Sequence, residues 1–386
     1  MLIVFASAKV MAEVFERLGQ PGLVGEILAG ILIGPSALSW IAPTEFLTAL
    51  ADLGAMFLLF RVGLDVKSSE LMKLGGTATL VAGSGVVVPF LMGWGILRAW
   101  GGSTNEAIFV GAAMVATSVG ITAQVLSAKN LLHATASKII LAAAVIDDVL
   151  GLLVLAVVSS VSKGELNIMG LVLTGVLAGG FTLIVAQWGT RAMGKVVPAL
   201  TQNLRVAEAQ FALAICLLFA LSVGAVYTGV AAIVGAFLAG LALAESTAPR
   251  IRDLTHGVTE LLVPFFLAGI GLHVDLSVFS ESGNILLASI VLVAAIVSKC
   301  IGCGFGALGL GRADAIRVGV GMIPRGEVGM VVAQIGLGLG IIKQNVYGVV
   351  VFMSVATTIV AAPLLKIAFR GVAPEGIPEK EEFRIG

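Results

Sequence analysis

The sequence predicts an all-α polytopic membrane protein with about 13 transmembrane helices, two of them broken. Three observations predict this class: an apolar composition, apolar runs long enough to cross a bilayer, and polar interruptions inside two of those runs. Hydrophobic residues make up 58% of the 386 residues and charged residues only 12%, with a mean hydropathy of +1.08. A soluble domain carries about a quarter charged residues, so a bilayer must solvate these side chains.

Apolar segments, separated by charged or Gly/Pro-containing breaks, are expected to form the helices, because crossing the hydrocarbon takes roughly 20 helical residues. Their approximate limits are 1–18, 21–39, 46–65, 75–99, 105–128, 134–162, 168–195, 204–226, 229–246, 256–273, 282–309, 313–341 and 343–370. Together they predict a single membrane transporter domain over residues 1–370. The polar residues 371–386 are expected to be a short cytosolic tail.

The basic residues predict the orientation of these segments. Most of the lysines and arginines outside the apolar segments fall on one side if the N-terminus is outside and the C-terminus is cytoplasmic, whereas Arg98, Lys163 and Lys343 fall on the other. Cytoplasmic loops carry the excess of Lys and Arg, so we expect a multi-pass protein of the cell inner membrane. The formal net charge is +0 and no basic run occurs, which argues against a nucleic-acid partner.

Three short motifs recur at a nearly constant spacing. The repeated segments are 24–30 and 234–240, 57–64 and 265–272, and 119–120 and 328–329. Each recurrence moves the motif by seven apolar segments, an odd number, so the two copies cross the membrane in opposite directions. This predicts inverted repeats over about 20–162 and 229–370, an architecture typical of alternating-access transporters.

Two adjacent carboxylates, Asp147 and Asp148, lie near the centre of the sixth apolar segment. Each ionised aspartate costs roughly 2.5–3.5 kcal/mol at mid-bilayer on insertion scales, so a functional role is favoured over packing. Neighbours on a helix point about 100° apart, so one can face an ion cavity while the other faces a partner helix. A carboxylate that binds either a proton or a cation meets the minimum requirement for exchange. The alternative is a structural ion pair.

Lys299 is the single charge in the apolar run from Leu286 to Phe305. An ammonium inside the membrane needs a counter-ion, and either Asp147 or Asp148 could supply it. A salt bridge that opens when the carboxylate is protonated would couple proton load to conformation. The alternative is a lysine that reaches to the membrane interface.

Two segments contain helix-breaking residues at matching repeat positions. The fifth carries Thr117, Ser118 and Gly120, and the twelfth carries Pro324, Arg325 and Glu327. Interrupted helices at corresponding positions point to a substrate site, because freed carbonyls and half-helix ends face the cavity. Arg325 and Glu327 are expected to support the site by compensating the exposed helix dipoles.

Four stretches of the sequence, residues 19–30, 116–123, 144–151 and 324–329, carry a family resemblance. They resemble the cation:proton antiporters of the NapA type, which are related to the NhaA and Kef proteins. The resemblance implies a homodimer, with a dimerisation domain and a six-helix core joined by a linker helix, here 168–195. It also implies an elevator-like movement of the core.

The resemblance further implies the roles of individual residues. Asp148 would bind the ion, Asp147 would pair with Lys299, and Thr117 and Ser118 would lie beside the ion. A chain with both aspartates and the lysine is similar to the electrogenic sodium/proton branch.

The leading hypothesis is a secondary active Na⁺(Li⁺)/H⁺ antiporter that uses the proton gradient to extrude sodium, with Na⁺ at Asp148. We expect no resident cofactor and no enzymatic activity, since the sequence contains no nucleophile–base constellation or metal-ligand cluster. The alternatives are a K⁺(Na⁺)/H⁺ antiporter of the Kef type and a cation channel. Glu26 and Arg61 are expected at the cytoplasmic rim, facing headgroups, and His256 at a segment end.

Overall fold

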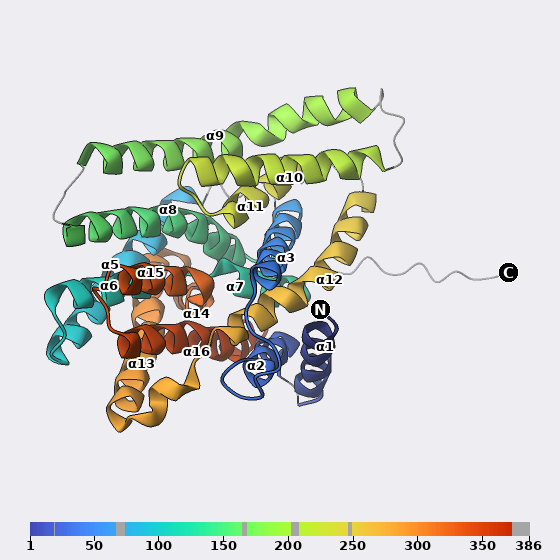
Figure 1. Cartoon of the computed structure of the whole chain (residues 1–386). Coiled ribbons are helices and arrows are strands. Elements are labelled where there is room, and N and C mark those ends of the chain that lie inside the picture. Colours follow the sequence, from blue (N-terminus) through green and yellow to red (C-terminus); the bar gives the residue numbers. More distant parts are fainter. Residues whose placement is uncertain (19, 67–73, 164–167, 202–207, 246–248, 373–386) are drawn as a thin grey trace.

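The computed structural model describes residues 1–18, 20–66, 74–163, 168–201, 208–245 and 249–372, and the described part is all-helical (Figure 1). A few side chains within these ranges, among them those of 326–328, lie outside the description. The helices are α1 (Leu2–Arg17), α2 (Gly22–Ile33), α3 (Glu45–Leu64), α5 (Gly75–Ala99), α6 (Thr104–Val115), α7 (Val119–Ala128), α8 (Thr135–Lys163), α9 (Ile168–Thr201), α10 (Ala209–Tyr227), α11 (Ala232–Leu243), α12 (Pro249–Leu272), α13 (Ser282–Gly306), α14 (Arg312–Gly321), α15 (Gly326–Gly338) and α16 (Gln344–Ala368), with short 3₁₀ turns at Leu276–Ser280 and Leu308–Leu310.

The described helices have the character of membrane spans. Seven of them are long and apolar enough to cross a bilayer, and shorter apolar helices accompany them. Each predicted apolar segment contains described helical residues, but several limits were wrong. The helix α2 ends at Ile33 instead of 39, because Gly34 precedes a proline and is held in an extended conformation. The helix α12 begins at Pro249 instead of 256, so His256 lies inside it.

Other limits shift less or lie outside the description. The helix α9 continues to Thr201, beyond the predicted end at 195. Residues 204–207, predicted to begin a segment, and the predicted tail from 373 onward are outside the described residues.

Two of the predicted segments are interrupted in the structure. The helix α6 ends at Val115 and α7 begins at Val119, while α14 ends at Gly321 and α15 begins at Gly326. The two interruptions meet: the amide of Ser118 donates to the carbonyl of Pro324 at 2.8 Å. Proline offers no backbone donor of its own, so at this crossing Pro324 takes part only as an acceptor.

The helices pack as two groups. The core group consists of α5–α8 and α13–α16, in which α5 packs against α6, α8 and α13, and α13 packs against α14 and α16. The scaffold group consists of α1–α3 and α9–α12, in which α3 packs against α11 and α12, and α2 packs against α1 and α12. The groups meet where α3 touches α7, α2 touches α16 and α8 touches α9.

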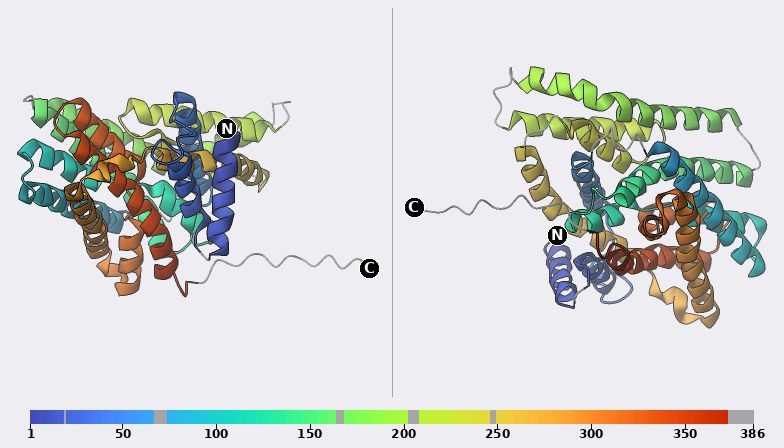
Figure 2. Two further views of the ribbon diagram at one scale, coloured as in Figure 1. Left: turned by 60° about the horizontal axis from the view of Figure 1, so that its bottom comes forward. Right: turned by 180° about the vertical axis from the view of Figure 1, so that it is seen from behind.

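The views agree on this division. In Figure 1 the scaffold helices run along the top and the right, and the core helices fill the lower left. Seen from behind, α9 and α10 again lie along one edge, with α13 toward the opposite side (Figure 2).

Glycines allow two close helix crossings inside the scaffold group. At the crossing of α3 and α11, a Cβ added to Gly240 would collide with the carbonyl oxygen of Phe60. At the crossing of α2 and α12, a Cβ added to Gly30 would collide with the carbonyl of Ala268. Gly30 and Gly240 are the equivalent positions of the predicted repeats, so the same contact recurs in both copies.

Candidate ion-binding site

Asp147 and Lys299 form a buried ion pair between α8 and α13. The Nζ atom of Lys299 lies 3.2 Å and 3.3 Å from the two carboxylate oxygens of Asp147. Both side chains have 0% of their surface exposed. Ion pairs at this depth hold only when each charge compensates the other, because neither is solvated. The structure therefore brings together the lysine and the first aspartate of the pair.

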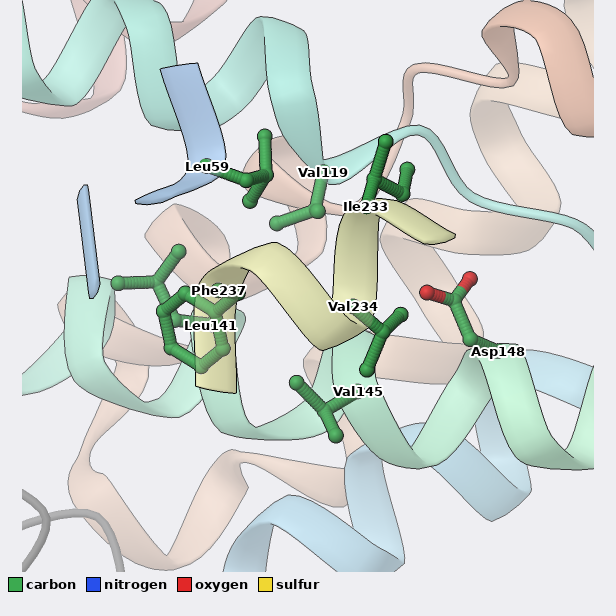
Figure 3. A pocket seen from close by; sticks show the side chains of 8 residues that line it. All are labelled: Leu59, Val119, Leu141, Val145, Asp148, Ile233, Val234 and Phe237. Carbon is green, nitrogen blue, oxygen red and sulfur yellow. The ribbon is translucent and has the colours of Figure 1, made fainter. Parts of the chain in front are cut away.

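Asp148 occupies a different face of α8, toward the scaffold group. It lines a cavity together with seven apolar residues (Figure 3). These residues are Leu59 of α3, Val119 of α7, Leu141 and Val145 of α8, and Ile233, Val234 and Phe237 of α11. The carboxylate lies at one end of this group of side chains, beside Ile233 and Val234 (Figure 3).

The size and position of this cavity suit a small ion. Its volume is about 10 Å³, which is roughly the space that one water molecule needs. Its wall is shared by the core group (α7 and α8) and the scaffold group (α3 and α11). The acid therefore lies at the boundary between the two groups, where a relative movement would change its surroundings.

The interruption between α6 and α7 supplies further oxygen atoms. Thr117 and Ser118 are 3% and 1% exposed, and the hydroxyl of Thr117 has no hydrogen-bond partner among the described residues. Ser118 directly precedes Val119, which lines the cavity at Asp148. Gly120 lies against Phe266, with its Cβ position 3.4 Å from that ring. Carboxylate, hydroxyl and carbonyl oxygens are the ligands that hard cations prefer.

Arg325 joins the two interrupted helices and is fully buried. Its Nη1 atom donates to the carbonyls of Val115 and Ala116 at 3.2 Å and 3.3 Å, and Nη2 donates to the carbonyl of Ala295 at 3.0 Å. Carbonyls at the end of a helix lack intrahelical partners and carry partial negative charge, so the guanidinium compensates the end of α6. The side chain of Glu327 lies outside the described residues.

Several charged residues lie where the sequence did not predict them. Glu26 is only 5% exposed and pairs with Lys9 at 3.3 Å instead of facing headgroups. Glu260 of α12 collects three partners, which are Lys9 at 3.7 Å, Arg61 at 3.9 Å and His256 at 3.6 Å. The charges of Lys9 and Glu26 inside apolar segments were the signal for this cluster, since each needs a counter-ion.

Comparisons with known proteins identify the family. The family model described as "Sodium/hydrogen exchanger, transmembrane" matches residues 2–371. The high-affinity Na⁺/H⁺ antiporter NhaS3 of Synechocystis is 33% identical over 98% of this chain and 91% of its own length. The Na⁺/H⁺-K⁺ antiporter GerN of Bacillus cereus is 31% identical over 95% of each chain.

A solved structure shows the same fold. The sodium proton antiporter MjNhaP1 of Methanocaldococcus jannaschii superimposes with a TM-score of 0.72 at 17% identity, covering 97% of each chain. The family match over nearly the whole chain, and relatives above 30% identity, settle the class of protein. The chain belongs to the sodium/hydrogen exchanger family, a family of multi-pass membrane transporters of monovalent cations and protons and not of enzymes.

Proposed function

We propose that this protein exchanges Na⁺ or Li⁺ for protons and uses the proton gradient to extrude sodium. Asp148 holds either a proton or the cation, and Asp147 with Lys299 sets the charge balance beside it. The observation that carries the proposal is the position of Asp148 in an ion-sized cavity between the core and scaffold groups. Its neighbour Asp147 is already neutralised by Lys299 at 3.2 Å.

Charge accounting explains why such a site exchanges ions. With Asp147 paired to Lys299, the remaining net charge is that of the Asp148 carboxylate. A bare carboxylate in an apolar cavity is costly, so the site favours being loaded with either H⁺ or Na⁺. Because the same oxygen atoms bind both, arrival of one displaces the other. The loaded, neutral form is the one that crosses between the two sides of the membrane.

The fold supports alternating access by inverted repeats. The equivalent glycines Gly30 and Gly240 make the same kind of close contact, and the equivalent helices α6/α7 and α14/α15 are both interrupted. We propose about 13 membrane-crossing segments, with the N-terminus outside, the C-terminus in the cytoplasm and the protein in the inner membrane. Residues 168–195 would link the two repeats, 20–162 and 229–370.

The movement and the assembly belong to the same proposal. The core group moves against the scaffold group and carries Asp148 from one side to the other. The large apolar surface of the scaffold, including Leu173 and Val176 of α9, is exposed in a single chain and is compatible with a homodimer in the bilayer.

The test is cation/proton exchange in inverted membrane vesicles, measured with a dye that reports the pH gradient. Wild type is expected to release the proton gradient on addition of NaCl or LiCl. Asp148→Asn should abolish this response, because an amide binds neither a proton nor Na⁺ well. Exchange that persists in Asp148→Asn would refute the proposal.

A second candidate is exchange of potassium. It is favoured by the 31% identity to GerN, which is named a Na⁺/H⁺-K⁺ antiporter. A response to KCl equal to or above that to NaCl in the same vesicles would select this candidate. A cation channel predicts ion flux without any proton movement, which the same dye separates from exchange.

A further inference from the structure

The side chain of Lys299 passes a gap in α5 on its way from α13 to Asp147. The gap is Gly85, which is buried. A Cβ added to Gly85 would lie 2.5 Å from Sγ of Cys303, 3.4 Å from Nζ of Lys299 and 3.9 Å from its Cδ. Contacts below 3.0 Å are essentially absent between real Cβ atoms and their neighbours, so no side chain fits at position 85 as the molecule stands.

We propose that Gly85 is a positioning residue for the exchange site. The missing side chain at position 85, with Cys303 beside it, defines the space in which the Lys299 ammonium lies against Asp147. The inference rests on the proposed function and deepens it, because it names what fixes the strength of the Lys299–Asp147 pair.

Cys303 completes this space from the side of α13. It lies four residues after Lys299, so both side chains project from the same face of the helix. Cys303 is 0% exposed, and its sulfur occupies the volume next to Gly85. A lysine side chain has four rotatable bonds, and the enclosure by Gly85 and Cys303 restricts it to the conformation that reaches Asp147.

The position of the ammonium matters because the pair lies in a medium of low dielectric constant. The attraction between two charges there falls steeply as they separate, and the present distances are 3.2 Å and 3.3 Å. A carboxylate that loses part of its cationic partner keeps its proton to higher pH. A side chain at position 85 therefore moves the pH range of exchange to the alkaline side.

Two other glycines of the same helices provide matched controls. Gly83 of α5 has nothing within 4 Å of its Cβ position, so Gly83→Ala reports the effect of the alanine alone. Gly302 of α13 lies at the same crossing, where a Cβ would meet the carbonyl of Ser84 at 2.6 Å. Gly302→Ala therefore disturbs the packing of α5 on α13 without a contact to Lys299.

The experiment is the pH profile of Na⁺/H⁺ exchange in vesicles for the full-length chain. We expect Gly85→Ala to move the midpoint of the profile by about half a pH unit or more to higher pH. Gly83→Ala should match wild type, and Gly302→Ala should lower the rate without moving the midpoint. Adding Cys303→Ala to Gly85→Ala removes the sulfur 2.5 Å away and should reverse the shift.

The outcomes decide between positioning and packing. An unshifted midpoint in Gly85→Ala, or an equal shift in Gly302→Ala, overturns the inference. If Gly85→Ala does not fold, Cys303→Ala decides: it frees the ammonium, so a smaller alkaline shift supports the inference and an unchanged profile overturns it. Exchange that survives Asp148→Asn in the same vesicles would instead refute the proposed function.

Discussion

At the scale of single residues, the buried pair of Asp147 and Lys299 accounts for how two acids are tolerated in an apolar helix. Both side chains are 0% exposed, so removing one leaves an uncompensated charge. Breaking a buried pair in this way costs about 3–5 kcal/mol, whereas replacing both charges together can be nearly neutral. Asp147 is therefore stable only in the company of Lys299.

This argument predicts strongly non-additive effects of mutation. Lys299→Ala should lower the stability by about 3–5 kcal/mol, and adding Asp147→Asn should restore most of that loss. The measurement is thermal unfolding in detergent of the two single variants and the double variant. Additive losses in the double variant would show that the two side chains do not compensate each other.

Sequence reasoning located some residues of the site but not their partners. The cost of charge in a membrane singles out Asp147, Asp148 and Lys299 without a structure. It could not choose which aspartate pairs with the lysine, because that depends on how far α8 is rotated relative to α13. Gly85 left no signal, since a glycine in an apolar helix has meaning only when its neighbours are known.

At the scale of secondary-structure elements, the two interrupted helices are held together by hydrogen bonds from both sides of the crossing. The hydroxyl of Thr122, in α7, donates to the carbonyl of Gly321 at the end of α14 at 2.6 Å. Thr122 is 0% exposed, so without that hydroxyl the carbonyl has no water to turn to. An unsatisfied buried group costs about 1–3 kcal/mol.

We therefore expect Thr122→Val to lower the stability by about 1–3 kcal/mol and to reduce the rate of exchange. The matched control is Thr79→Val, because the hydroxyl of Thr79 donates at 2.8 Å to Gly75 in an exposed part of α5. That control should stay within about 0.5 kcal/mol of wild type. Equal effects of the two substitutions in thermal unfolding would contradict a role for the crossing.

The elements themselves were largely accessible to prediction, and their ends less so. Pro324 and the Gly-rich run around it predict an interruption through the missing backbone donor. The carbonyls bound by Arg325 could not be predicted, since they come from α6 and α13, far away in the sequence. The same holds for the pairing of Lys9 with Glu26, which depends on α1 packing against α2.

At the scale of the whole molecule, the division into core and scaffold groups predicts which contacts must break during transport. The cavity at Asp148 is lined by Val145 of the core group and by Leu59 and Phe237 of the scaffold group. Movement between the groups separates Val145 from Phe237, whereas Leu59 and Phe237 travel together.

Cross-linking distinguishes these two kinds of contact. In a chain whose three native cysteines are replaced, a cleavable thiol cross-linker between cysteines at Val145 and Phe237 should stop exchange. Cleaving the linker should restore it. A cross-link between cysteines at Leu59 and Phe237 should leave most of the exchange of the uncross-linked parent. Full activity with Val145 and Phe237 tethered would exclude movement at this boundary.

The central claim is that one carboxylate, Asp148, binds a proton or a sodium ion in turn. The most direct measurement is the release of protons when NaCl is added to the purified protein in weakly buffered detergent solution. The account predicts proton release by wild type that saturates with Na⁺ and is absent in Asp148→Asn. Sodium binding without proton release, or unchanged release by Asp148→Asn, would contradict it.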